Sequence, residues 1–341
     1  MERIVIAVLF SAGLGLIVFH QFRIRTEAPE RARKNVALSR TAVQSSAGDC
    51  RMQSVRLLWP LGGEAGKDWV IANYVDHDKR KNSMRDYLGR TGAEAVTYDG
   101  HQGLDLEIPN FRMMDKGIPV YAATEGVVEE VFDSSPDRNL HCAPDKWNHV
   151  TLRHTGGWKT IYAHLKRGSV KVHPGAKVAA GTQLGFVGSS GCSTFPHLHF
   201  EVVDCQGRVI DPVKDALFVS PPNDVMTWAP KVMDLSIFQP IIHSILPILD
   251  PGTTDRNLVS AGYDFSVGVT ISALKPGDVL SMEFLSPARE DREVFFERLV
   301  TQFLPRSHWW GNYRFDFPGT WTLVIKVNER TIYERPVIAS Q

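Results

Sequence analysis

The chain has 341 residues, enough for two domains, and its 43% hydrophobic content suffices for packed cores. Its 38 Lys and Arg residues balance 38 Asp and Glu residues, and no long basic run follows the N-terminal region. This charge balance argues against nucleic acid as a partner.

An apolar run without charges covers residues 4–19. The run is longer than the apolar core of a typical signal peptide, and no clear cleavage site follows it, which favours an uncleaved anchor. Basic residues after the run argue against export of the remainder, but the chemistry described below favours export. We therefore expect a signal peptide or signal-anchor helix in residues 1–25, with membrane anchoring through residues 4–19, and a basic linker in residues 26–50.

The four cysteines include no Cys-x-x-Cys pair, so a thiolate zinc site is not expected. Their even number fits one or two disulfides in an exported protein, and free thiols are the alternative. Nothing in the sequence selects a pairing among Cys50, Cys142, Cys192 and Cys205.

Short segments with period-two alternation, punctuated by Gly and Pro turns, fill residues 51–217. No long amphipathic helix interrupts them, so this part is predicted to be an all-β domain built on an antiparallel sheet. A polar insert, residues 133–148, separates two of the segments. The predicted strands include residues 55–60, 69–75, 126–131, 149–154, 158–165 and 196–202.

Residues 218–257 are Pro-rich and irregular and are predicted to form a linker. Residues 258–341 return to period-two alternation, which predicts a smaller β-sandwich, with an immunoglobulin-like fold as one option. The Trp309-Trp310 pair is expected to pack in a core or between domains, rather than to bind a ligand.

The segment Pro196-His197-Leu198-His199-Phe200-Glu201-Val202 carries two histidines two residues apart. On a strand these imidazoles and the carboxylate of Glu201 share one face, and the apolar residues share the other. Taken alone, the pattern fits a solvated strand face as well as a metal or catalytic site. The chain supplies partners for the second interpretation in His101-x-x-x-Asp105 and Tyr162-Ala163-His164.

Together these motifs resemble those of the lysostaphin/LytM-type zinc metallopeptidases, which cut peptide cross-bridges in bacterial cell walls. The resemblance covers roughly residues 97–212, and its strength lies in the number and order of the matches rather than in any one of them. The matching motifs are Gly100-His101-x-Gly103-x-Asp105, Gly117-x-Pro119-Val120-Tyr121-Ala122, Tyr162-x-His164-Leu165, Gly185-x-Val187-Gly188 and Pro196-His197-Leu198-His199-Phe200-Glu201-Val202.

The resemblance implies that His101, Asp105 and His199 hold one Zn²⁺ and that His164 and His197 are catalytic. Zinc with three protein ligands keeps one open position and brings the pKa of a water there near 7. The two catalytic histidines would orient or deprotonate this water and stabilise the oxyanion, and the sequence does not say which does which.

Three further residues or segments bear on this site. Glu201 could orient a ligand histidine or lie at the surface. Phe195 stands where the family often has a small residue, and the insert 133–148 is long, so both could reshape the substrate groove. Neither departure removes a zinc ligand.

These features predict a zinc endopeptidase that cleaves peptidoglycan stem peptides or cross-links by means of a zinc-activated water. Such an enzyme is exported and acts in the periplasm or outside the cell. Two alternatives are a non-catalytic wall-binding regulator of other wall hydrolases and an exported protease that acts on proteins.

Overall fold

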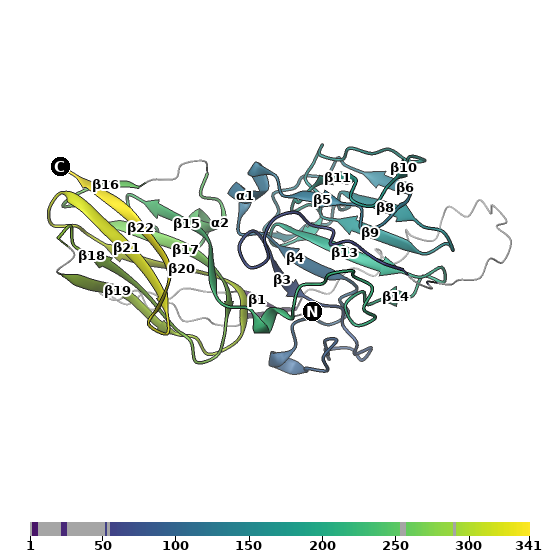
Figure 1. The fold of residues 1–341 in the computed structure, drawn as a ribbon, viewed down its shortest axis with the longest axis horizontal. Helices are drawn as coiled ribbons and strands as arrows, with labels where there is room; N and C mark the ends of the chain where they lie inside the picture. The colour runs from purple at the N-terminus through teal and green to yellow at the C-terminus, as the bar shows by residue number, and fades with distance from the viewer. Residues whose placement is uncertain (1, 6–21, 26–51, 53–54, 253–256, 289–290) are drawn as a thin grey trace.

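The computed structural model describes residues 2–5, 22–25, 52, 55–252, 257–288 and 291–341. Two β-rich halves lie side by side along the long axis (Figure 1), which confirms the all-β prediction. In the described ranges the only α-helices are α1 (Phe111–Lys116) and α2 (Leu246–Leu249). Two short 3-10 helices lie at Gly92–Glu94 and Val225–Thr227. None of these helices has the length and apolar character that crossing a membrane requires.

Near the N-terminus, β1 (Glu2–Val5) pairs antiparallel with β2 (Phe22–Arg25). Residues 6–21, which make up most of the expected signal segment, lie outside the described residues, and so does the expected linker 26–50. The signal or anchor segment therefore stays a prediction.

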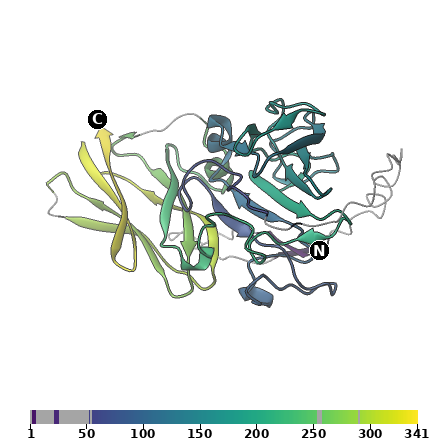
Figure 2. The ribbon, with the colours of Figure 1, turned by 45° about the vertical axis from the view of Figure 1, so that its right-hand side comes forward.

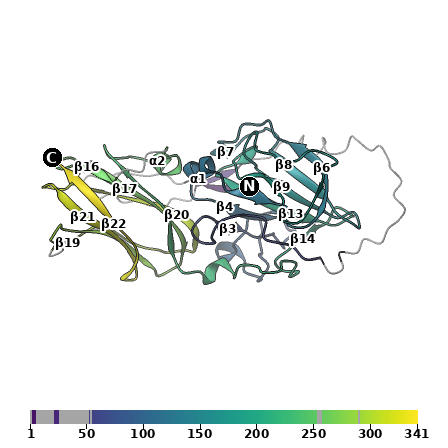
Figure 3. The same cartoon turned by 45° about the horizontal axis from the view of Figure 1, so that its top comes forward.

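The first domain is organised around one antiparallel sheet with the strand order β10-β6-β8-β9-β13-β4-β3, and β14 pairs with the far end of β13. Figure 3 shows β6, β8, β9 and β13 next to one another in this sheet. Two small ribbons, β5–β11 and β7–β12, flank it. The bounds are β3 Val70–Asn73, β4 Leu104–Glu107, β5 Pro119–Tyr121, β6 Gly126–Phe132, β7 His141–Cys142, β8 His149–Arg153, β9 Lys159–Ala163, β10 Lys177–Val178, β11 Gln183–Phe186, β12 Cys192–Ser193, β13 His197–Val203 and β14 Val209–Ile210.

Alternation along β4 and β13 separates core side chains from polar ones, as the sequence predicts. Leu198, Phe200 and Leu106 are fully buried in the hydrophobic core. Because side chains on a strand alternate between faces, His199 and Asp105 project from the opposite face, and they stand directly across from each other in the β13–β4 register. This register places an imidazole beside a carboxylate.

The second domain is a β-sandwich, as expected, and its three-stranded sheet is the one nearer the first domain (Figure 2). Aromatic side chains fill the space between the sheets, among them Phe265, Phe284 and Trp309, which confirms core packing for Trp309. One sheet has the order β15-β17-β20 and the other β16-β22-β21-β18-β19. The bounds are β15 Lys231–Phe238, β16 Leu258–Ser260, β17 Phe265–Leu274, β18 Val279–Leu285, β19 Arg292–Leu299, β20 Leu304–Tyr313, β21 Gly319–Val327 and β22 Arg330–Ser340.

Two segments differ from their predicted structures. The expected linker contains β15, which pairs with β17, and the helix α2. Prolines on either side of β15 and a register shift between Val232 and Asp234 obscure its alternation in the sequence. The expected strand at residues 55–60 contributes a single bridge between Leu57 and Phe218, because its other backbone groups bond to separate segments at Ala123 and Tyr121. The domain boundaries themselves stay a prediction.

Polar contacts dock the sandwich on the first domain. The Asp234 carboxylate in β15 accepts hydrogen bonds from Asn110 and Arg112, which flank the start of α1. Arg138 pairs with Asp115 in the first domain and with Asp250 beyond α2, each at 2.8 Å. These contacts join the two domains at two separated points.

Candidate active site

Three buried side chains converge on the polar face of β4 and β13. His101 Nε2 lies 3.0 Å from Asp105 Oδ1 and 3.3 Å from His199 Nδ1. His199 Nδ1 lies 2.9 Å from the same carboxylate oxygen. Tetrahedral zinc ligands at about 2.0–2.1 Å from the ion lie roughly 3.3 Å apart. Two imidazole nitrogens and one carboxylate oxygen at these separations therefore fit a metal ion.

A glycine between the two motif residues makes this convergence possible. A Cβ added to Gly103 would lie 2.8 Å from His199 Nε2 and 2.6 Å from the carbonyl oxygen of Phe200. Both distances are shorter than any non-bonded carbon contact, so a side chain here would push His199 away. The Gly in His101-x-Gly103-x-Asp105 is thus a requirement of close packing.

Each metal-facing group is oriented by a further contact on its other side. His101 Nδ1 donates to the Tyr74 carbonyl oxygen at 2.7 Å, so in the neutral ring the lone pair is on Nε2. The second oxygen of Asp105 accepts from Asn73 Nδ2 at 3.0 Å. His199 Nε2 lies 3.8 Å from Glu201 Oε2 on the same strand face, so Glu201 is placed to orient this histidine.

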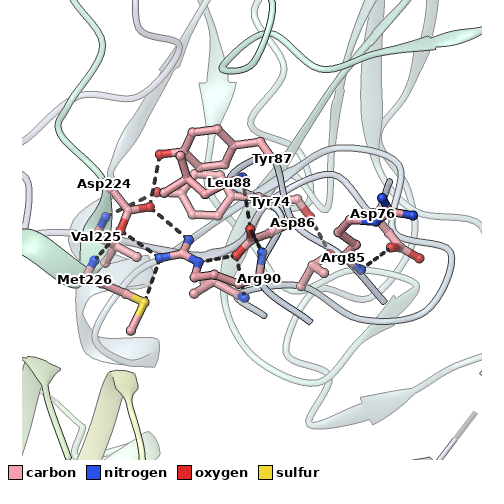
Figure 4. A network of polar contacts seen from close by, with 12 residues as sticks. Tyr74, Asp76, Arg85, Asp86, Tyr87, Leu88, Arg90, Asp224, Val225 and Met226 are labelled. Atoms are coloured by element: carbon pink, nitrogen blue, oxygen red, sulfur yellow. Dashed lines mark hydrogen bonds and ion pairs between the residues drawn. The ribbon is translucent and has the colours of Figure 1, made fainter. Parts of the chain in front are cut away.

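Tyr74 is itself held by the network drawn in Figure 4. Its ring packs on Tyr87 with centroids 4.7 Å apart, and its hydroxyl accepts from the Val225 backbone N–H at 3.2 Å. Arg90 joins the two sides, because it donates to both carboxylate oxygens of Asp224 at 3.0 Å and to Asp86 at 2.5 Å. The network fastens the segment after β3 to the turn that follows the first domain, and it thereby fixes the carbonyl that orients His101.

The remaining two motif histidines lie beside the metal-facing group. The rings of His164 and His197 have centroids 4.4 Å apart. His164 Nδ1 donates to the Ser190 carbonyl oxygen and His197 Nδ1 donates to the Phe195 carbonyl oxygen, both at 2.7 Å. A carbonyl oxygen only accepts, so in the neutral form of each ring the proton is on Nδ1 and Nε2 has the lone pair. His197 Nε2 lies 3.6 Å from Asp105 Oδ1.

His164 directly follows β9 and adopts a left-handed backbone conformation with φ of 62°. In the neighbouring register, Ala163 stands opposite His199. A residue that continued β9 in extended conformation would alternate to the core face; the left-handed turn instead directs the imidazole toward the site. Non-glycine residues rarely adopt this conformation, and such strain is concentrated at functional positions.

Burial and mutual proximity shift the pKa values of these groups. Burial lowers the pKa of His164 well below its ordinary value, and the imidazoles of His197 and His199 add to the effect, so His164 is neutral at pH 7. Burial also lowers the pKa of His199, but hydrogen bonds to Asp105 and Glu201 outweigh it and raise that pKa to about 9. Burial raises the pKa of Asp105, yet the surrounding imidazoles bring it well below its ordinary value, which keeps the carboxylate ionised.

Two exposed aromatic side chains flank the site. Trp147 is 36% exposed and contacts His164 edge-on, with centroids 5.3 Å apart, while its ring is nearly parallel to that of His199 at 6.0 Å. Tyr98 is 40% exposed and lies 4.4 Å from the ring of His101. The aromatic faces offer apolar contact to a peptide approaching the metal-facing atoms.

Trp147 belongs to the insert 133–148, which a disulfide ties to the site. Cys142 is bonded to Cys192, in the loop that carries Ser190, and β7 pairs with β12 around this bond. Cys205 is also disulfide-bonded. A Cβ on Gly191 would lie 2.9 Å from the Trp147 backbone, so insert and loop are in close contact. The insert is thus one wall of the site.

Residues 99–212 match the model of Peptidase family M23. This chain carries a peptidase family M23 domain. The match spans the five motif residues predicted from the sequence, and the structure brings all five together.

Similar proteins share this part of the chain. A segment of 135 residues is 35% identical to the DD-carboxypeptidase/endopeptidase Mpg of Neisseria meningitidis serogroup B and covers 40% of this chain and 26% of that protein. A segment of 114 residues is 33% identical to the peptidoglycan DD-endopeptidase ShyA of Vibrio cholerae serotype O1 and covers 33% of this chain and 22% of that protein. The chain thus spans about a quarter of the length of these curated relatives.

Among solved structures, the catalytic domain of lysostaphin from Staphylococcus simulans is similar over 33% of this chain and 77% of that chain, with 28% identity and a TM-score of 0.26. A zinc-containing peptidase from Vibrio cholerae is similar over 46% of this chain and 41% of that chain, with 25% identity and a TM-score of 0.28.

Several residues around the site were not predicted from the sequence. Tyr74 and Phe195 contribute backbone carbonyl groups, which no side-chain motif reveals. Asn73 lies one residue past a register shift in β3, and Trp147 lies in an insert without periodic pattern. The sequence did contain a signal for Trp147, since it is an aromatic residue in an otherwise polar insert. That insert also carries Cys142, and the Ser189-Ser190-Gly191-Cys192 loop carries a second cysteine.

Proposed function

We propose that this protein is a zinc-dependent endopeptidase that hydrolyses peptide bonds in peptidoglycan stem peptides or cross-links. One observation carries the proposal: a buried triangle of His101 Nε2, Asp105 Oδ1 and His199 Nδ1 lies beside two histidines whose Nε2 atoms keep their lone pairs. The two relatives named above, each described as an endopeptidase, support the reaction class, and the description of ShyA as a peptidoglycan DD-endopeptidase supports the wall substrate.

In the proposal, His101, Asp105 and His199 hold the zinc ion. When bound, zinc supplies Lewis acidity toward a peptide carbonyl and lowers the pKa of a water molecule to near 7. Asn73, Tyr74 and Glu201 contact the three ligand side chains and keep their donor atoms aimed at one point.

His164 and His197 manage the proton in this mechanism. A neutral Nε2 with a lone pair can accept a proton from the attacking water, and the resulting imidazolium can donate it to the leaving amide nitrogen. It can also donate a hydrogen bond to the oxyanion of the tetrahedral intermediate. The carbonyl groups of Ser190 and Phe195 hold the Nδ1 atoms throughout, so the rings keep their orientation.

A wall substrate lies outside the cytoplasm, and the Cys142–Cys192 disulfide fits an oxidising compartment. We propose action in the periplasm or outside the cell, with anchoring through residues 4–19 as the expected mode of attachment. The substrate peptide would lie between Trp147 and Tyr98, whose exposed rings flank the site.

The test is digestion of purified peptidoglycan by the zinc-loaded full chain, with the released muropeptides identified by mass. Wild type and the control His173→Ala, an exposed histidine, should release products, and a chelator or His199→Ala should abolish release. Chelator-insensitive release, or full release by His199→Ala, would refute the proposal. Wall binding without zinc would favour the regulator, and cleavage of unfolded proteins but not of wall would favour the protein protease.

A further inference from the structure

One side chain of the second domain reaches the two strands that carry the site. The Arg306 guanidinium, in β20, lies over the ring of Phe195 at 3.3 Å from the ring centroid. Its Nε donates to Glu107 Oε2 at 2.8 Å. Glu107 lies in β4, directly opposite His197 of β13. Arg306 therefore contacts both the loop that precedes β13 and the neighbouring strand β4.

Phe195 links this contact to a motif histidine. The ring is only 5% exposed, so it packs against the second domain instead of lining an open groove. The Phe195 carbonyl oxygen accepts from His197 Nδ1 at 2.7 Å and from Ser193 Oγ at 2.8 Å. The position of this peptide group thus decides which nitrogen of His197 carries the proton and where the ring points.

Arg306 is in turn held from within the second domain. Its Nη1 donates to His308 Nε2 at 2.5 Å, and His308 Nδ1 bonds to the Thr270 hydroxyl at 2.9 Å. The His308 ring also lies 5.5 Å from the ring of Phe195. Burial and the adjacent guanidinium lower the pKa of His308 well below its ordinary value, so it is a neutral acceptor. A continuous chain of buried and partly buried polar groups therefore runs from β17 through β20 to Glu107.

We propose that Arg306 is a positioning residue for His197, through which the docked β-sandwich keeps the imidazole in its Nδ1–H tautomer with Nε2 toward the metal-facing group. The proposal rests on the proposed function for its kinetic consequence, although the tautomer itself does not depend on any activity. It gives the second domain a role inside the active site. It also accounts for Phe195, since the guanidinium stacks on the large ring where the family often has a small residue.

The experiment compares Arg306→Ala and Arg306→Lys with the control Arg314→Ala in the full chain. Arg314 is 56% exposed in its side chain and pairs only loosely with Asp264 at 3.8 Å. The first readout is the ¹⁵N spectrum of histidine-labelled protein, in which His197→Ala identifies the His197 signals and their shifts report the tautomer. The second is the kcat and KM of peptidoglycan hydrolysis together with bound zinc.

We expect Arg306→Ala to shift His197 toward a mixture of tautomers and to lower kcat roughly 10- to 100-fold, with KM and zinc content within twofold of wild type. Arg306→Lys keeps the charge near Glu107 but loses the planar stack, so it should fall between. Arg314→Ala should match wild type. Wild-type His197 shifts in Arg306→Ala would overturn the proposal, as would an unchanged kcat in an active enzyme.

If Arg306→Ala does not fold, Phe195→Leu is the second variant, because it removes the stacked ring but keeps the carbonyl group and should give the same two changes. A wild-type chain that binds zinc yet leaves the wall intact would refute the proposed function alone. The histidine spectra would still decide the positioning role in that case.

Discussion

Asn73 offers a sharp test of how the metal-facing group is supported. A register shift in the β3–β4 pairing between Ile71 and Asn73 places Asn73 directly opposite Asp105. Its Nδ2 then donates to the carboxylate oxygen that does not face the two imidazoles. Replacing Asn73 by Leu keeps a side chain that branches at Cγ and removes this donor.

The magnitude follows from the burial of Asp105, which is 4% exposed. A hydrogen bond to a buried charged group contributes about 1.5–3 kcal/mol, and a tenfold change in affinity corresponds to about 1.4 kcal/mol. If the donor acts mainly by orienting the ligand oxygen, zinc affinity should fall about 10- to 100-fold. The substitution leaves the hydrogen bond between His101 Nδ1 and the Tyr74 carbonyl oxygen intact, so the two imidazoles remain in place.

The assay is competition for zinc between the full chain and a chromophoric chelator at pH 7.5. Asn223→Leu, an exposed asparagine in the turn after the first domain, is the control and should bind zinc as wild type does. A zinc affinity of Asn73→Leu within twofold of wild type would refute the reasoning, as would an equal loss in the control.

Three further perturbations test the contact of Trp147 with substrate, the contribution of the Cys142–Cys192 disulfide to stability and the pH dependence due to His154. Trp147→Ala should raise KM for wall peptides about 2- to 10-fold while zinc content stays at the wild-type level, which steady-state kinetics and metal analysis check. Cys142→Ser with Cys192→Ser should lower the free energy of unfolding by about 2–4 kcal/mol, measured with urea; a stability equal to that of wild type would contradict this. Burial lowers the pKa of His154, so the neutral form stabilises the fold at and above pH 6.5, and this stability is lost as pH falls below 6.5. The free energy of unfolding of wild type in urea should therefore fall more between pH 7.5 and 5.5 than that of His154→Gln. Equal falls in the two proteins would argue against this role of His154.

The sequence predicted the parts of the site that follow from alternation. Period-two spacing placed His197, His199 and Glu201 on one face of β13, and the structure confirms the opposite core face of Leu198 and Phe200. His101 lies beside Asp105 even though it precedes β4 instead of lying in it. These features depend on local backbone geometry, which a short sequence contains.

The supporting contacts could not be predicted because they depend on distant parts of the chain. The carbonyl groups of Tyr74, Ser190 and Phe195 become visible only once loops are placed against the sheet. Likewise, Arg306 looks like an ordinary charged residue on an alternating strand, since its partner Glu107 lies 199 residues away. Strand β15 was missed because prolines flank it on both sides, and the partner of its Asp234, Arg112, lies 122 residues away.

The left-handed backbone at His164 implies a trade-off between durability and turnover. A non-glycine residue in such a conformation costs on the order of 1–3 kcal/mol, which the surrounding sheet must offset. Substitutions that relax this position, above all to glycine, therefore raise resistance to unfolding and remove the imidazole in the same step. Selection of this chain for thermal stability alone is therefore expected to replace His164 early. A variant selected for higher thermal stability should be assayed for hydrolysis before it is used further.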